Sequence, residues 1–324
     1  MTETSGRLVI QSEELDAEAA GWLAARTNLQ RVLFDSDEFG RLLPQADGLV
    51  VRTYTRVDRR LLDAAPTLAV IGRAGVGLDN IDLEACAERG IAVVHTPGAN
   101  SRAVVEYVLA LTFDALRPRL FLQESMDLVA WKKLRGELIA PRQLSDLTVG
   151  VLGFGRIGSQ VARAMTALDA DVLYHDVREV EEGDRFGAKP VTLHELAERS
   201  DVLTVHVDGR PGNRHLVNAD VFGRLKSDVV FINTSRGMVV EPRACAAFMG
   251  AHSGATAMLD VHDPEPIEDD SPLWQLPNVH LAPHIAGATA TAKRAMSWVV
   301  KDVWRVLAGE KPCYAAVDPS SGKG

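Results

Sequence analysis

Short apolar runs alternate with segments of helical periodicity along almost the whole chain. In the first hundred residues the apolar runs are rich in Leu or β-branched residues, and they lie at Leu8–Ile10, Arg31–Phe34, Gly48–Val51, Leu68–Ile71 and Ile91–Val94. The segments between them that predict helices are Glu14–Ala25, Arg59–Ala65 and Leu83–Arg89. Strands that alternate with helices predict βαβ units and a parallel sheet. We therefore expect a five-stranded α/β unit with flavodoxin-like winding.

A helix predicted from Ser101 separates this unit from a second α/β series. Val104 and Val108 recur on one face of the helix, and Pro118 predicts its end. Continuous apolar runs such as VLTVHV suit strands that are buried on both faces. The strands predicted for the second series are Val149–Gly153, Val172–His175, Val202–Val207, Val229–Asn233, Ala257–Val261 and Val279–Leu281, and a helical stretch follows at Thr291–Leu307.

A glycine-rich sequence, GFGRIG, directly follows the first strand of the second series. Gly153 allows the tight turn, Gly155 lets the backbone approach a pyrophosphate, and Gly158 lets the next helix pack close to the strand. The helix N-terminus offers unpaired N–H groups and a partial positive charge to an anion. This pattern predicts a dinucleotide-binding fold.

An acidic residue at the end of the next strand refines the cofactor prediction. Asp176 follows the strand Val172–His175. An acid at this place can accept hydrogen bonds from both ribose hydroxyls, and it repels a 2′-phosphate. The pattern therefore favours NAD over NADP, although Arg178 weakens the discrimination.

Composition and charge narrow the class of protein. The 324 residues carry 35 Lys and Arg against 44 Asp and Glu, a net charge of −9, so nucleic acid and anionic membranes are poor partners. We expect no transmembrane span and no secretory signal in MTETSGRLVI, because apolar runs are short throughout. Three cysteines without metal-type spacing fit a reducing compartment, so we expect a cytoplasmic protein without a metal site.

Polar residues that could bind a keto acid and exchange a proton during its reduction follow three strands of the second series. Arg236 follows VVFIN, Asp260 and Glu265 follow AML, and His284 follows VHL. Ligands of open α/β sheets bind beyond the carboxyl ends of the strands. A guanidinium can hold a carboxylate in bidentate fashion, and an imidazole beside a carboxylate can exchange a proton near neutral pH. We therefore expect Arg236, Glu265 and His284 to form a catalytic group.

The motifs GFGRIG, NTSRG, LDVHDPEP and APHIAGAT, in this order, resemble those of the D-isomer-specific 2-hydroxyacid dehydrogenases. The segment IGRAGVGLDN, with Val51 and Arg52, is similar to the phosphoglycerate dehydrogenase branch of that family. The resemblance implies a Rossmann-type doubly wound domain at residues 101–289, inserted into a smaller flavodoxin-like α/β substrate-binding domain at residues 1–100 and 290–324. It also implies a homodimer formed through the NAD domain.

The resemblance implies a role for each residue that matches a family motif. Arg236 binds substrate and stabilises developing oxygen charge, His284 is the acid/base, and Glu265 pairs with it. Asp176 contacts the adenosine ribose, and Asp260 holds the carboxamide of the nicotinamide. The residues implied to contact the cofactor are Gly153, Gly155, Arg156, Ile157, Gly158, Asp176, Val207, Thr234, Ser235, Asp260, His284 and Gly287.

The substrate site implied by the resemblance includes four residues of the first hundred. Val76 and Gly77 present backbone N–H groups to the substrate carboxylate. Arg52 and Arg73 match basic residues that engage the phosphate in phosphoglycerate-type members.

Five positions depart from the pattern of the phosphoglycerate branch. Tyr54, His95, Asp208, Thr256 and His262 stand where other residue types are customary. The catalytic trio is intact, so these departures bear on the substrate and on the cofactor rim. The chain also ends before the regulatory domain of longer phosphoglycerate enzymes, so we do not expect feedback control through that domain.

The sequence thus predicts an NAD-dependent oxidoreductase that interconverts a small D-2-hydroxy acid and its 2-keto acid. The first candidate is 3-phosphoglycerate, converted to 3-phosphohydroxypyruvate. Glyoxylate or hydroxypyruvate reduction, or another D-2-hydroxy acid, is the alternative within this class. A non-enzymatic NAD(H)-sensing protein on the same scaffold is the alternative from another class, because a fold does not fix a function.

Overall fold

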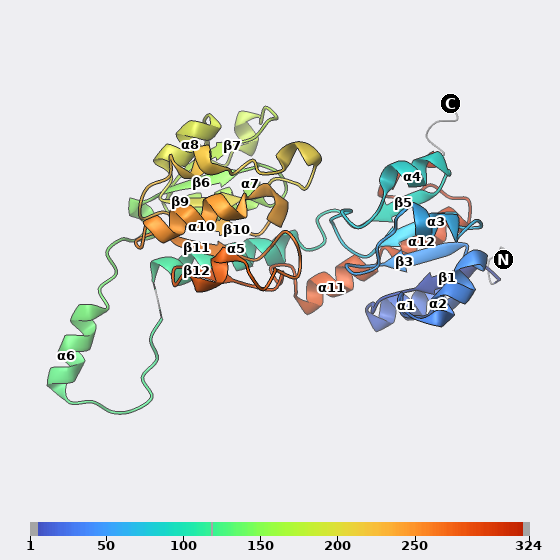
Figure 1. The fold of residues 1–324 in the computed structure, drawn as a ribbon, viewed down its shortest axis with the longest axis horizontal. Helices are drawn as coiled ribbons and strands as arrows, with labels where there is room; N and C mark the ends of the chain where they lie inside the picture. Colours follow the sequence, from blue (N-terminus) through green and yellow to red (C-terminus); the bar gives the residue numbers. More distant parts are fainter. Residues whose placement is uncertain (1–5, 118, 320–324) are drawn as a thin grey trace. The chain divides into compact units, whose positions relative to one another are not determined.

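The structure is a computed structural model that describes residues 6–117 and 119–319. It divides into two compact units (Figure 1). Unit 1 comprises the described residues of the ranges 1–100 and 288–324, and unit 2 comprises those of 101–287. The assignment of unit 1 to substrate binding stays a prediction.

Unit 1 is built on a six-stranded sheet. Its order is β13-β5-β4-β3-β1-β2, and all neighbours are parallel except β13 and β5. The first five strands have the flavodoxin order 2-1-3-4-5, which confirms the predicted winding. The strands are β1 (Leu8–Gln11), β2 (Asn28–Arg31), β3 (Gly48–Val51), β4 (Val70–Arg73), β5 (Ala92–His95) and β13 (Ala315–Val317).

Most helices of unit 1 begin at a side chain that caps a backbone N–H group. Asp16, Ser36, Asp58, Asp82 and Thr289 each accept a hydrogen bond from a backbone N–H in the first turn. These caps explain why the helices begin where they do. The helices are α1 (Ala17–Ala24), α2 (Asp37–Leu42), α3 (Arg59–Asp63), α4 (Leu83–Glu88), α11 (Ala290–Ser297), α12 (Val300–Leu307) and the short 3₁₀ helix η1 (Leu43–Gln45).

Several predicted boundaries in unit 1 were wrong. The second strand lies at Asn28–Arg31, three residues before the predicted run, because this edge strand is half exposed and Leu33 and Phe34 lie beyond its end. The predicted helix Thr291–Leu307 is two helices, α11 and α12, which part at Trp298 and Val299. The sequence also gave no indication of β13, a short and largely exposed strand.

Unit 2 contains a seven-stranded parallel sheet. Its order, β12-β11-β10-β9-β6-β7-β8, is the doubly wound Rossmann order extended by one strand. The predicted fold class is therefore confirmed. The strands are β6 (Thr148–Leu152), β7 (Asp171–His175), β8 (Lys189–Pro190), β9 (Val202–Val205), β10 (Val230–Asn233), β11 (Thr256–Leu259) and β12 (Val279–Leu281).

The helices of unit 2 begin with α5, which starts at Ser101 as predicted and ends at Leu116. Pro118, the predicted end signal, lies outside the described residues. The other helices are α6 (Leu128–Glu137), α7 (Gly158–Thr166), α8 (Leu193–Arg199), α9 (Ala219–Phe222) and α10 (Pro242–Ala251), with 3₁₀ turns η2 (Leu144–Asp146), η3 (Glu182–Asp184), η4 (Pro211–Asn213), η5 (Gly237–Val239) and η6 (Pro272–Gln275).

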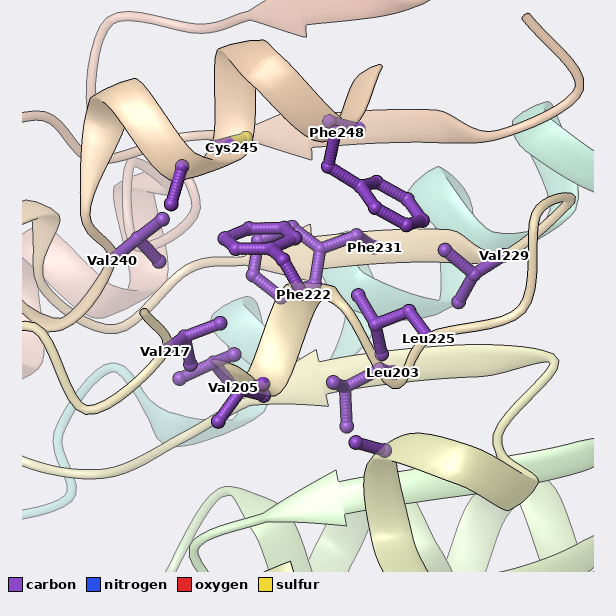
Figure 2. Close-up of a cluster of buried hydrophobic side chains, with 14 of the residues drawn as sticks. Leu203, Val205, Val217, Phe222, Leu225, Val229, Phe231, Val240, Cys245 and Phe248 are labelled. Atoms are coloured by element: carbon purple, nitrogen blue, oxygen red, sulfur yellow. The ribbon is translucent and has the colours of Figure 1, made fainter. Parts of the chain in front are cut away.

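An aromatic cluster fills the core on one face of this sheet. The ring of Phe222 lies 5.2 Å from that of Phe231 and 5.7 Å from that of Phe248, measured between centroids (Figure 2). Val205 at the end of β9 and Cys245 of α10 belong to the same buried cluster. The packing fixes β9, β10 and α10 against each other, and so it fixes the loops that leave these strands.

Two predicted absences concern membranes and disulfides. No helix of the described ranges has the length and apolar character needed to cross a membrane. Cys86, Cys245 and Cys313 are free thiols, and the first two are buried. A cytoplasmic location stays a prediction.

Candidate functional site

The polar residues predicted to act lie at one edge of the unit 2 sheet. All seven strands are parallel, so their carboxyl ends meet at the same edge. The direction of the strand order reverses between β6 and β9, which is where open α/β sheets bind ligands.

At two positions after β6 the fold leaves no room for a side chain, so only glycine fits. Gly153 has φ of 92°, and a Cβ there would crowd the backbone of Val207. A Cβ on Gly158 would overlap the carbonyl oxygen of Gly153, because α7 begins directly against the end of β6. These positions confirm the close packing expected of the strand–turn–helix unit.

Gly155 differs from these two because open space lies beside it. A Cβ built there meets no atom within 4 Å. Nearby, α7 begins at Gly158, and Ile157 at its N-cap position makes no side-chain capping hydrogen bond. A bare backbone at an uncapped helix N-terminus is suited to a pyrophosphate. The loop therefore fits the dinucleotide that the family implies.

Asp176 lies directly after β7 and joins that strand to the glycine loop. Its carboxylate accepts hydrogen bonds from the backbone N–H of Phe154 at 2.7 Å and of Arg178 at 2.8 Å. The Arg178 guanidinium adds an ion pair at 3.2 Å. Burial alone would raise the pKa of Asp176, but these hydrogen bonds lower it below its ordinary value. The carboxylate is thus fixed in its charged form.

A cavity of about 300 Å³ adjoins Asp176 and has both charged and apolar residues in its wall. Its lining includes Asp176, Arg178, Glu179, Arg185 and Val191. The cavity lies beyond β7, where the adenosine half of a dinucleotide binds in this fold.

Two buried polar atoms near the strand reversal have no hydrogen-bond partner among the described residues. They are Oγ1 of Thr234, directly after β10, and Nδ1 of His206, directly after β9. Burial lowers the pKa of His206 to about 3, so its ring is neutral. Buried polar groups normally have partners. A bound cofactor would supply them, so these atoms also fit the predicted NAD.

The turn that carries Arg236 is held by the side chain of Asn233. The side-chain Oδ1 of Asn233 accepts hydrogen bonds from the N–H and hydroxyl of Ser235, and its Nδ2 donates to the backbone carbonyl of Arg236 at 3.0 Å. The Arg236 guanidinium donates to the Ser235 carbonyl at 2.7 Å. Asn233 is buried, so the turn is rigid.

Gly237 lets this turn approach the loop that follows β11. A Cβ on Gly237 would overlap the carbonyl group of His262. The Arg236 turn and the loop 262–265 are therefore in direct backbone contact. The structure brings these two predicted elements together.

Glu265 and His284 form a hydrogen-bonded pair. Nδ1 of His284 lies 2.8 Å from Oε2 of Glu265, and Oε1 accepts from the backbone N–H of His262 at 3.0 Å. Burial alone would raise the pKa of Glu265, but the hydrogen bonds from His284 and His262 lower it. Glu265 is therefore charged near neutral pH. The His284 side chain is 44% exposed and accessible to a ligand.

Asp260 fixes the backbone on which His284 stands. Its carbonyl accepts from the N–H of His284, and its carboxylate accepts from Ile285 and Ala286, each at 2.8 Å. These bonds hold His284 at φ of 56°, a left-handed conformation that is strained for a non-glycine residue. Burial raises the pKa of Asp260, and the backbone bonds lower it only part of the way. Its predicted contact with the carboxamide stays a prediction.

Unit 1 contains the four residues predicted to bind substrate: Arg52, Arg73, Val76 and Gly77. Arg52 directly follows β3, and its guanidinium donates to the carbonyl of Glu14 at 3.2 Å. The guanidinium of Arg73, at the end of β4, packs against the Cα of Gly75. The ring of His95 contacts the Val76 carbonyl at 3.1 Å.

Glu13 fills the equivalent strand reversal of unit 1, between β1 and β3. Its carboxylate accepts hydrogen bonds from the backbone N–H groups of residues 52–55, at 2.9 to 3.2 Å. Burial would raise the pKa of Glu13, but these bonds lower it. The chain's own carboxylate thus shapes the loop of Arg52 and Tyr54.

Sequence reasoning assigned no role to Asn233 or Glu13. A polar residue that ends a buried strand is the only signal for Asn233, and Glu13 lies in a polar stretch without a motif. Of the five departures, Tyr54 is largely exposed, Asp208 forms an ion pair with Arg210, and nothing in the structure explains Thr256.

No cluster of three or more His, Cys, Asp or Glu side chains in the described ranges is arranged to hold a metal ion. The described site consists of a glycine-rich loop, three fixed carboxylates, a guanidinium and an imidazole, all in unit 2.

Known proteins are similar to this chain in both sequence and fold. A D-3-phosphoglycerate dehydrogenase of Archaeoglobus fulgidus is 36% identical over 267 residues, which are 82% of this chain and 50% of that protein. An (S)-sulfolactate dehydrogenase of Chromohalobacter salexigens is 36% identical over 298 residues, covering 86% of this chain and 93% of that protein. The chain spans about half the length of the phosphoglycerate dehydrogenases that it matches.

A solved structure of a dehydrogenase is also similar to this chain. D-Lactate dehydrogenase of Aquifex aeolicus, in complex with NAD and lactic acid, superposes with a TM-score of 0.79 at 27% identity, covering 94% of this chain and 96% of that one. Residues 109–286 match the sequence model of the D-isomer specific 2-hydroxyacid dehydrogenase, NAD binding domain. The chain therefore belongs to the D-isomer specific 2-hydroxyacid dehydrogenases.

Proposed function

We propose that the chain is an NAD-dependent oxidoreductase that interconverts a small D-2-hydroxy acid and its 2-keto acid. The observation that carries the proposal is the 2.8 Å contact between Nδ1 of His284 and Oε2 of Glu265. Because the carboxylate can only accept, Nδ1 carries the proton, and Nε2 is left to exchange a proton with a ligand.

In the direction of reduction, protonated His284 gives its Nε2 proton to the carbonyl oxygen of the keto acid. The charged carboxylate of Glu265 stabilises the protonated ring and fixes its orientation. The guanidinium of Arg236 binds the substrate and stabilises the charge that develops on its oxygen. Bound NADH supplies the hydride.

The proposed cofactor contacts lie in the loops that follow the strands of unit 2. The backbone around Gly155, Arg156 and Ile157 and the N-terminus of α7 bind the pyrophosphate. Asp176 accepts from the adenosine ribose, and its negative charge disfavours a 2′-phosphate. Val207, Thr234, Ser235, Asp260, His284 and Gly287 contact the nicotinamide half.

We propose a three-carbon substrate with a second anionic group, and 3-phosphoglycerate is the first candidate. Arg52 and Arg73 supply two guanidiniums for that group, and Val76 and Gly77 bind the carboxylate through backbone N–H groups. The relatives from Archaeoglobus and Chromohalobacter are named for a phosphorylated and a sulfonated three-carbon acid. Glyoxylate or hydroxypyruvate reduction is the alternative, supported by Tyr54, whose bulk stands where a small residue is customary.

We also propose a homodimer formed through unit 2. None of the residues of α6 is buried in the single chain. Exposed apolar side chains cluster on this helix and the segments beside it: Leu120, Phe121, Leu122, Leu128, Val129, Trp131, Leu138 and Ile139. Such a set is typical of a surface that a partner covers. Sedimentation of the wild-type chain as a monomer would contradict the proposal, and Val129→Asp is expected to weaken the dimer.

The decisive test is a panel of keto acids with NADH and with NADPH. We expect NADH oxidation with 3-phosphohydroxypyruvate, and less with glyoxylate, hydroxypyruvate and 3-sulfopyruvate. Faster turnover of glyoxylate or hydroxypyruvate favours the alternative substrate. Tight NADH binding without turnover of any acid favours the NAD(H)-sensing protein, and the intact Arg236, Glu265 and His284 argue against that outcome.

A further inference from the structure

We infer that His262 is a positioning residue that holds Glu265 and His284 in their catalytic arrangement. The inference rests on the proposed function, because it concerns the same proton-transfer pair. His262 occupies a position that the family motif does not assign to an acid, a base or a ligand. Its side chain acts through two neighbouring loops.

Three contacts of His262 place it where the site loops meet. Its backbone N–H donates to Oε1 of Glu265 at 3.0 Å. Its ring Nε2 lies 2.8 Å from the carbonyl oxygen of Ala282, two residues before His284. Its carbonyl group packs directly against Gly237, in the turn of Arg236. One residue therefore contacts the loops of all three predicted catalytic residues.

The ring contact has a defined direction. A carbonyl oxygen only accepts hydrogen bonds, so Nε2 of His262 must carry the proton. The ring thus donates a hydrogen bond from the loop after β11 to the segment after β12. This bond fixes the spacing between the backbone of Glu265 and the backbone of His284. The 2.8 Å bond between their side chains depends on that spacing.

Two backbone hydrogen bonds also link these segments, from the N–H of Ala282 to the Leu259 carbonyl and from the N–H of His284 to the Asp260 carbonyl, each at 2.8 Å. Both involve residues before the loop 262–265, so they do not hold that loop. Arg214 forms an ion pair with Asp263 at 2.9 Å, but both side chains are partly exposed and screened by solvent. The Asp260 carboxylate accepts from Ile285 and Ala286, so this side chain holds the residues after His284 and not the loop 262–265. Among the described residues, the His262 ring is the side chain that links the loop 262–265 to Ala282, just before His284.

The test compares two substitutions of the same ring. His262→Phe keeps an aromatic side chain and the backbone N–H to Glu265, but it removes the donor to Ala282. His262→Gln restores an N–H group at about the distance of Nε2. We expect His262→Phe to lower kcat about five- to tenfold with KM changed less than twofold, and His262→Gln to recover most of the loss.

A matched control is available in the same unit. The ring of His252 contacts the carbonyl of Phe248 at 2.9 Å, at the end of α10. His252→Phe therefore removes the same kind of bond away from the strand ends, and we expect it to leave kcat unchanged. An equal loss of kcat in His252→Phe and His262→Phe would mean that general destabilisation causes the loss, and it would overturn the inference.

A double-mutant cycle separates positioning from stability. If His262 acts through Glu265, then His262→Phe should cost little activity in a Glu265→Gln background. The full fivefold or larger loss in that background would contradict the inference. Melting temperatures of all variants identify any that fail to fold, and His262→Gln keeps the test valid in that case.

A spectroscopic readout makes the test independent of turnover. A hydrogen-bonded Nδ1–H of a histidine gives a downfield proton resonance, which a His284→Ala spectrum assigns. We expect this resonance to broaden or shift upfield in His262→Phe and to return in His262→Gln. An unchanged resonance in His262→Phe would overturn the inference. Absence of turnover in the wild type, with the resonance responding as expected, would instead count against the proposed function.

Discussion

Nδ1 of His284 and Oε2 of Glu265 lie 2.8 Å apart, although 19 positions separate the two residues along the chain. They come from loops after β11 and β12, which are neighbours in the sheet. The contact gives His284 a fixed orientation and a charged partner, and these are the two requirements for a directed proton transfer.

Loss of the imidazole should stop the chemistry without loss of the cofactor. We expect His284→Ala to lower kcat for keto acid reduction by about 10²- to 10⁴-fold, because the proton donor is gone. Glu265→Gln keeps the hydrogen-bonding shape without the charge, so its loss should be smaller. Steady-state kinetics and NADH fluorescence titration check both effects. Retained turnover in His284→Ala would refute its role.

Two substitutions in the glycine-rich loop should change different properties, one the affinity for NADH and the other the stability of the fold. Gly155→Ala should leave the melting temperature unchanged and weaken NADH binding at least about tenfold, since its Cβ enters the open space where we propose that the pyrophosphate binds. Gly158→Ala should lower the melting temperature, since its Cβ overlaps the Gly153 carbonyl. Gly212→Ala, in the 3₁₀ turn η4 where a Cβ also meets open space, is the control. Unchanged NADH affinity in Gly155→Ala would contradict the assignment.

Asp176 should control the choice between NADH and NADPH. We expect Asp176→Ala to raise the ratio of kcat/KM for NADPH to that for NADH by about tenfold or more. The substitution removes a negative charge and leaves Arg178 to attract the 2′-phosphate. Asp171→Ala, at the other end of β7, removes a charge away from the site and serves as control. A ratio that stays constant would exclude Asp176 from the ribose site.

Glu13 should make the stability of the loop 52–55 depend on pH. Its pKa in the folded chain is lowered, so its contribution is fully present above the ordinary glutamate pKa. That contribution is lost as the pH falls through the lower folded value. We expect Glu13→Gln to lower the melting temperature by about 2–4 °C at pH 7 and by less near pH 3. Exposed Glu124→Gln is the control, and an equal difference at both pH values would contradict this account.

Arg52 should distinguish between substrate classes. We expect Arg52→Ala to raise KM for a phosphorylated keto acid at least about tenfold and KM for glyoxylate less than twofold, because only the former carries a second anion. Initial-rate measurements with both acids check this. Similar changes in KM for both would remove the phosphate role from Arg52.

The alternation of apolar runs and helical periodicity was sufficient to predict both sheets. The central strands of unit 2 are buried on both faces, so their sequences are continuous apolar runs with clear ends. Three of the four edge strands lack this signal. β2 is half exposed, β13 is largely exposed and β8 contains a proline, so periodicity placed β2 wrongly and missed the other two.

The candidate site was predictable where a motif carries its chemistry in one short segment. Gly153, Asp176 and His284 each follow an identifiable strand. The contacts that hold them come from residues distant in sequence, such as Asp260 to Ala286 and His262 to Ala282. Such contacts depend on the register of neighbouring strands, which a single sequence does not encode in any local pattern.

The last helix of the chain packs on the sheet of the first hundred residues. Val300, Val303 and Leu307 of α12 belong to the same buried cluster as Val9 of β1 and Val70 of β4. During translation, unit 2 leaves the ribosome before α12 exists, so the inserted unit can fold first. Helix α1 packs in the same cluster, but the part of this sheet face that α12 covers stays exposed until residue 307 emerges, and the nascent chain carries that apolar surface for the whole synthesis of unit 2.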